Sequence, residues 1–198
     1  MVTKLAVIFF SMILVDNYVL VKFLGICPFL GVSKKLDSAI GMSGAVIFVM
    51  VLATAFTHTI YTYLLSPLGL EYLNTIVFIL IIASLVQLVE TVLKKYMKAL
   101  YSALGVYLPL ITTNCAILAV TLLNISNEYN LIESIVCAIG AGVGFLVVMV
   151  IFSGVRRKVD EAIVLPTFDG LPITLIAAAI VSLSFTGFGG IVENIFKV

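Results

Sequence analysis

Two cysteines in matching surroundings are the residues of this chain best suited to chemistry. Cys27 lies in the segment LVKFLGICPFLGV, residues 20–32, and Cys115 lies in LPLITTNCAILAV, residues 108–120. The segments share Leu, Cys, Leu and Val at equal spacing, 88 residues apart. Thiolates are the soft ligands that suit zinc, copper(I) and iron–sulfur clusters. The pair therefore indicates a metal or cluster site, and burial as a small apolar side chain is the simpler alternative.

Each cysteine lies beside residues that interrupt a helix. Pro28 removes a backbone donor, so we expect a new helical piece to begin at Pro28 with Cys27 as its cap. In the second segment Pro109 disturbs the helix, and the Thr-Thr-Asn sequence of residues 112–114 can cap a piece that starts near Cys115. Both cysteines would then lie at helix N-termini, where the partial positive charge favours a thiolate.

The composition indicates a membrane protein. Apolar residues make up 63% of the 198 residues, charged residues make up 11%, and the mean hydropathy is +1.28. A soluble domain has about half apolar and a quarter charged residues, so this chain is expected to lie in lipid. The net charge of +1 gives no indication of a nucleic-acid partner. Three cysteines, an odd number, argue against a disulfide framework, and Cys137 is interpreted as packing.

Long apolar runs predict an all-α integral membrane protein with six transmembrane helices, the first and fourth broken near the cysteines. The runs cover about residues 5–30, 38–70, 72–89, 99–123, 134–155 and 170–192. Because the cysteine segments fall in the first and fourth runs, the single transmembrane domain divides into two three-helix repeats, about residues 1–98 and 99–198. An odd number of spans per repeat makes the second copy enter the membrane from the opposite side.

The loop charges predict the orientation. The links after the first, third and fifth spans hold eight of the eleven basic residues: Lys34, Lys35, Lys94, Lys95, Lys98, Arg156, Arg157 and Lys158. Basic links remain in the cytoplasm, so both termini are expected outside.

Four polar residues are further candidates for an ion path or for an interface with a partner protein. Asp16 and Lys22 lie in or near the first span, together with Asn17. An intramembrane charge is a functional candidate by default, and a structural role is the alternative. Glu90 ends the third span next to basic residues, where an exposed helix-end ion pair is the simpler interpretation. Asn114 precedes the second cysteine.

Longer stretches resemble the Rnf/Nqr family of membrane subunits. The resemblance is carried by VLVKFLGICPFLGVSKKLDSAIGM, residues 19–42, and by LGVYLPLITTNCAILAVTLLN, residues 104–124. It continues through residues 85–90, 142–156 and 187–190, so it covers nearly the whole chain. Within the family the chain is more similar to the A-type subunits of Rnf complexes than to the E-type subunit of the sodium-translocating NADH:quinone oxidoreductase, which is the alternative.

The resemblance implies a subunit of a bacterial or archaeal cytoplasmic-membrane complex that exchanges electrons between ferredoxin and NAD, coupled to Na⁺ or H⁺ translocation. It implies pairing with a paralogous E-type subunit of opposite orientation, and association with the B, C, D and G subunits and with membrane lipid. The pair would share a 2Fe–2S cluster, with Cys27 and Cys115 as this chain's two ligands. No catalysis by the chain alone is expected.

Two other functions are compatible with the residues. Inverted repeats with broken helices are typical of secondary transporters, although cysteines are poor ligands for hard cations such as Na⁺. A structural membrane anchor would make the paired cysteines accidental.

Overall fold

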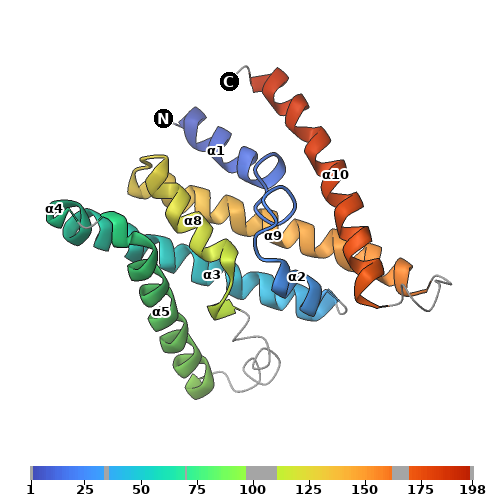
Figure 1. Cartoon of the computed structure of the whole chain (residues 1–198), viewed down its shortest axis with the longest axis horizontal. Helices are drawn as coiled ribbons and strands as arrows, with labels where there is room; N and C mark the ends of the chain where they lie inside the picture. Colours follow the sequence, from blue (N-terminus) through green and yellow to red (C-terminus); the bar gives the residue numbers. More distant parts are fainter. Residues whose placement is uncertain (1, 34–35, 70, 97–110, 162–169, 197–198) are drawn as a thin grey trace.

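A computed structural model describes residues 2–33, 36–69, 71–96, 111–161 and 170–196, which contain helices and turns and no β-strand. The helices are α1 Val2–Leu14, α2 Ile26–Val32, α3 Leu36–Ile60, α4 Ser66–Leu68, α5 Asn74–Tyr96, α8 Cys115–Ser126, α9 Leu131–Asp160 and α10 Leu171–Phe196 (Figure 1). A π-helical turn, Tyr61–Leu65, joins α3 to α4, and a 3₁₀ turn, Glu71–Leu73, precedes α5. The predicted all-α class is confirmed.

The described helices correspond to the predicted spans. Three helical stretches are long and apolar enough to cross a membrane: Ser38–Leu65, Asn74–Val92 and Leu131–Val159. They are the second, third and fifth predicted spans. Shorter apolar helices, Thr3–Leu14, Cys115–Ser126 and Leu171–Gly187, belong to the first, fourth and sixth. Pro109 and the predicted boundary between the repeats near residue 98 lie outside the described residues.

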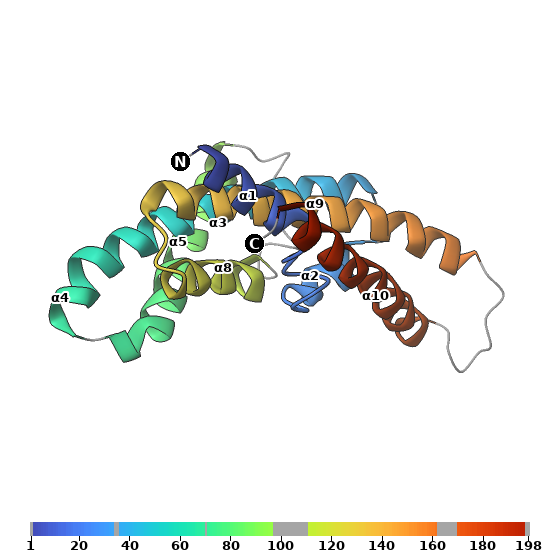
Figure 2. The same ribbon diagram turned by 90° about the horizontal axis from the view of Figure 1, so that it is seen from above.

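Helices α3 and α9 form the centre of the molecule and run antiparallel. The C-terminal end of α3 meets the start of α9. His58, near the end of α3, has its Nε2 3.1 Å from the carbonyl oxygen of Tyr129, which lies just before α9. Figure 2 shows α1, α3 and α9 in one layer, with α2 and α8 on one side of it. Antiparallel packing of the second and fifth spans is the arrangement that inverted repeats require.

Glycines let the backbones of this layer approach closely. A Cβ atom on Gly142 would lie 2.6 Å from a side-chain carbon of Ile47 in α3. On another side of α9, a Cβ on Gly140 would lie 3.1 Å from the Phe9 carbonyl oxygen, and one on Gly144 would lie 3.1 Å from that of Met12. Two small residues four positions apart form the spacing that lets membrane helices pack tightly.

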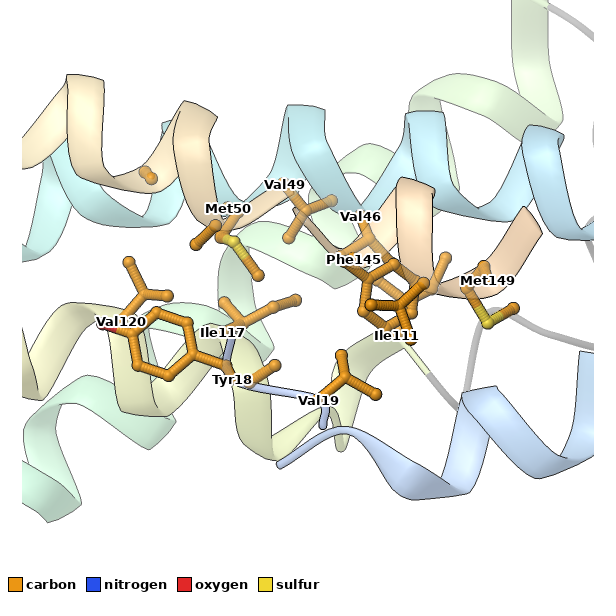
Figure 3. Packing of buried hydrophobic residues seen from close by; sticks show 14 of the residues in the cluster. Tyr18, Val19, Val46, Val49, Met50, Ile111, Ile117, Val120, Phe145 and Met149 are labelled. Atoms are coloured by element: carbon orange, nitrogen blue, oxygen red, sulfur yellow. The ribbon is translucent and has the colours of Figure 1, made fainter. Parts of the chain in front are cut away.

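The buried core lies between this layer and the cysteine segments. Figure 3 shows Tyr18 and Val19 of the first cysteine-bearing span beside Ile117 of α8, all facing the α3 and α9 side chains. Phe29 of α2 stacks on Phe152 of α9 with ring centroids 4.0 Å apart. Both cysteine segments are therefore packed on one apolar surface.

The two short helices α2 and α8 run to opposite ends of the α3–α9 pair. Arg156, near the end of α9, donates to the Leu30 carbonyl oxygen and to Ser33 Oγ at the end of α2. The loop that follows α8 instead reaches the other end, where Tyr129 contacts His58. The opposite directions agree with the prediction that the second copy enters the membrane from the other side.

Candidate functional site

The first span is interrupted over residues 15–25, here called the first break. Helix α1 ends at Leu14, and α2 begins at Ile26 with Gly25 as its cap in a left-handed conformation, φ 85°. The prediction that Cys27 caps a helix starting at Pro28 was wrong. Pro28 lies in the first turn of α2, where the backbone N–H groups have no intrahelical partner, so a proline is tolerated there. Cys27 is in the first turn itself.

Asn17 organises the first break and is almost fully buried. Its amide nitrogen donates to the Gly144 carbonyl oxygen of α9 at 3.1 Å, and its Oδ1 accepts from the Val19 backbone N–H at 3.0 Å. Ser182 of α10 donates to the Leu20 carbonyl oxygen. Irregular backbone is tolerated at membrane depth only where its polar groups find partners, and these contacts provide them.

The second break, residues 113–114, separates the helical residues 111–112 from α8. Asn114 is the cap of α8, and its Oδ1 accepts the backbone N–H of Ala116 at 3.0 Å. Cys115 is the first residue of α8. The predicted capping of a helix near Cys115 is thus confirmed, with Asn114 as the capping residue.

The two breaks touch each other although they are far apart in the sequence. A Cβ atom on Gly25 would lie 3.1 Å from Asn114 Oδ1, 3.2 Å from the Ala116 Cβ and 3.6 Å from the Phe145 ring. Phe145 and the Gly144 that binds the first break lie midway along α9, which spans Leu131–Asp160. The breaks therefore meet near the middle of the apolar stretch of α9.

Both cysteines lie close in the sequence to the residues that meet at this point. Cys27 is two residues beyond Gly25, and Cys115 lies between Asn114 and Ala116. Both are exposed free thiols, whereas Cys137 in α9 is buried. Within the described ranges, no three His, Cys, Asp or Glu side chains gather into a metal-binding group. A cluster with four cysteine ligands that includes Cys27 and Cys115 would therefore take its other two ligands from outside the described residues.

The predicted charged candidates have different surroundings. Asp16 and Lys22 belong to the first break and form a loose ion pair, 4.0 Å between Nζ and Oδ1, with both side chains partly exposed. Asp16 also accepts from Ser11 Oγ at 3.2 Å, and the Lys22 ammonium lies 5.2 Å from the centre of the Tyr18 ring. Asp16 directly precedes Asn17, so this pair lies in the first break beside the residue that anchors it to α9.

Glu90 lies elsewhere, near the end of α5, and is half-buried. Among the hydrogen bonds and ion pairs of the described chain segments, none joins it to either break. The structure thus places Asn114 beside Cys115 and at the contact with Gly25, places Asp16 and Lys22 in the first break, and places Glu90 in α5.

Three residues that hold the site were absent from the predicted site: Asn17, Arg156 and Ser182. Asn17 carried a detectable signal, because an amide inside an apolar span needs a partner. Arg156 was assigned only to a basic link, yet it is 7% exposed and binds the end of α2. No sequence pattern indicated the long-range contact of Ser182 with the first break.

The chain matches the family model described as "Rnf-Nqr subunit, membrane protein" over residues 5–192. It belongs to the Rnf-Nqr family of membrane subunits. The match includes both breaks and both exposed cysteines, so the site lies wholly inside the family region. The fold and the family together make this a multi-pass membrane protein.

Individual relatives of this Rnf-Nqr chain are similar over nearly its full length. It is 54% identical over 183 residues to the A subunit of the Na⁺-translocating ferredoxin:NAD⁺ oxidoreductase complex of Acetobacterium woodii, covering 92% of this chain and 95% of that one. It is 50% identical over 191 residues to the A subunit of the ion-translocating oxidoreductase complex of Aliivibrio fischeri, covering 96% and 99%. The A subunit of the same-named complex of Thioalkalivibrio sulfidiphilus is 50% identical over 191 residues, covering 96% and 100%. These names describe subunits of oxidoreductase complexes.

Proposed function

We propose that this chain is the A-type membrane subunit of an ion-translocating ferredoxin:NAD⁺ oxidoreductase complex, and that Cys27 and Cys115 bind half of a 2Fe–2S cluster within the membrane. Its relatives' names support the complex. The meeting of two cysteine-bearing breaks supports the cluster. A paralogous subunit of opposite orientation would supply the other two thiolates, and the B, C, D and G subunits would complete the complex.

The observation that carries the cluster proposal is the contact of Gly25 with Asn114 and Ala116. It brings together the starts of two short helices, whose cysteines are 88 residues apart in the sequence, at one point midway along α9. Each helix presents an exposed cysteine in its first turn. Iron–sulfur clusters are held by four thiolates, so two exposed thiols fit half of such a site.

The surroundings fit a sulfur-rich anionic group. The first-turn backbone N–H groups of α2 and α8 lie next to the cysteines, and the positive ends of helices stabilise negative charge. Asn114 adds a buried amide donor beside Cys115 that lacks a partner among the described residues. When bound, a 2Fe–2S cluster supplies one-electron transfer. Asn17, Ser182 and Arg156 hold the first break and α2 in position through their hydrogen bonds.

The names of the relatives are what support the proposal of ion translocation. The relative from Acetobacterium woodii is named as Na⁺-translocating, and other relatives are named only as ion-translocating. We extend to this chain a coupling to Na⁺ or H⁺ movement in a cytoplasmic membrane, with both termini outside. We assign the Asp16–Lys22 pair to an ion path or to the partner interface, and the partial exposure of both side chains is compatible with either role.

The test is electron paramagnetic resonance and iron content of the complex purified through a tag on this chain. We expect a 2Fe–2S signal that Cys27→Ser and Cys115→Ser each abolish, while Cys137→Ser keeps it because that thiol is buried in packing. The protein composition of each purified variant shows whether the complex still assembles. An unchanged signal and iron content in both Cys27→Ser and Cys115→Ser would refute the cluster proposal.

A further inference from the structure

An unsatisfied hydrogen-bond donor lies directly beside the second cysteine. Asn114 is only 4% exposed, and its Oδ1 is engaged by the Ala116 backbone N–H at 3.0 Å. Its Nδ2 is buried and has no hydrogen-bond partner in the part of the chain that the structure describes. Buried polar groups are almost always paired, so an unpaired one calls for a partner beyond the residues that the structure describes.

The orientation of this amide is fixed by the cap. Exchanging Oδ1 and Nδ2 would place an N–H donor against the Ala116 N–H, which is also a donor, and would remove the cap of α8. Gly25 also packs against Oδ1, because a Cβ added to Gly25 would lie only 3.1 Å from it. Nδ2 therefore keeps both of its hydrogens for another acceptor.

The position of Asn114 indicates what that acceptor is. Asn114 precedes Cys115 and touches Gly25, which lies two residues before Cys27. Asn124, a buried asparagine within α8, provides a contrast. Its Nδ2 donates to the Ser134 carbonyl oxygen at 3.4 Å, and its unpaired atom is the acceptor Oδ1. Of these two asparagines, the one beside the cysteines retains an unpaired donor.

We propose that Asn114 Nδ2 donates a hydrogen bond to sulfur at the cysteine site, either a ligand thiolate or a sulfide of the cluster, and thereby raises the reduction potential of the cluster. This inference rests on the proposed function. Reduction adds negative charge to the cluster, and N–H donors to sulfur stabilise the more negative state. Asn114 is thus a tuning residue as well as a helix cap.

The test is a redox titration of the purified complex, followed by the 2Fe–2S signal, in two variants that keep the cap. Asp and Ser both cap helices well, so Asn114→Asp and Asn114→Ser retain an acceptor for Ala116 N–H while they remove Nδ2. At the wild-type midpoint we expect the ratio of reduced to oxidised cluster to fall about tenfold in Asn114→Asp, which corresponds to about 59 mV for one electron. Asn114→Ser should shift in the same direction by less, because it adds no charge.

A matched control and a second readout separate tuning from a structural effect. Asn124→Ser changes a buried asparagine of the same helix and should leave the midpoint unchanged. Transfer into D₂O identifies which proton couplings in the pulsed paramagnetic resonance spectrum of the reduced cluster are exchangeable. Both Asn114 variants should show one such coupling fewer than the wild type. If Asn114→Asp loses the signal, the Ser variant decides.

The two proposals fail in different ways. A wild-type complex without a 2Fe–2S signal would overturn the proposed function. A wild-type signal with unchanged midpoint and unchanged proton couplings in Asn114→Ser would overturn this inference alone.

Discussion

The contact between the two breaks predicts that Gly25 cannot carry a side chain. Gly25→Ala places a Cβ where the backbone is left-handed, at φ 85°, and where Asn114 Oδ1 and the Ala116 Cβ lie at 3.1 and 3.2 Å. The left-handed conformation costs a non-glycine residue about 1–2 kcal/mol. Overpacking a buried site costs a further 1–3 kcal/mol or so. We therefore expect the free energy of unfolding to fall by about 2–5 kcal/mol.

The assay is unfolding of the purified chain in mixed micelles with increasing SDS, followed by circular dichroism, with two glycine controls. Gly69→Ala has the left-handed backbone, φ 65°, but no described atom within 4 Å of the new Cβ, so it should cost only about 1–2 kcal/mol. Gly41→Ala lies within α3 in open space and should stabilise by about 0.5–1 kcal/mol. The excess cost of Gly25→Ala over Gly69→Ala measures the crowding between the breaks.

A second substitution makes the test specific to the contact. Ala116→Gly removes the Cβ that Gly25→Ala would meet at 3.2 Å, so the double variant should recover part of the lost stability. Side chains in direct contact show coupling free energies of about 0.5–3 kcal/mol. The reasoning is refuted if Gly25→Ala costs no more than Gly69→Ala and Ala116→Gly gives no recovery, because the breaks would then not touch.

Two further predictions concern the first break and the orientation. Asn17→Ala should lower the free energy of unfolding by about 1–3 kcal/mol, because buried backbone groups lose their hydrogen-bond partner. Asn127→Ala, at the exposed end of α8, should lower it less in the same assay. Equal losses in the two variants would contradict the described role of Asn17. The predicted orientation can be tested with a thiol reagent that does not cross membranes. It should label Asn127→Cys from outside intact cells and Lys158→Cys only from the cytoplasmic side. Labelling of both variants from the same side would contradict the predicted orientation.

The sequence predicts the second break better than the first. Asn114 directly before an apolar run is a local signal, because a capping side chain and the N–H it binds lie within two residues of each other. Pro28 misled the prediction of the first break, since a proline fits anywhere in the first turn and does not identify the first helical residue. The left-handed Gly25, not the proline, marks where α2 begins.

The contacts between distant segments could not be read from the sequence. Asn17 binds a carbonyl oxygen 127 residues away, and Arg156 binds an oxygen 126 residues away. Such partners depend on how α9 packs against both halves of the chain, and backbone carbonyl oxygens look the same in every residue. The structure nevertheless brings the two duplicated cysteine segments into contact through Gly25.

The close approach of the glycines in α9 limits which parts of the molecule can move. Secondary transporters with inverted repeats work by rocking one bundle against another around a fixed site. Here α9 lies almost backbone to backbone against α1 at Gly140 and Gly144 and against α3 at Gly142, so it cannot slide past either helix without a clash. Under the proposed function, the movement that links electron transfer to ion transfer is therefore expected around this closely packed frame, in the helices that pack on it less closely or in neighbouring proteins of the complex.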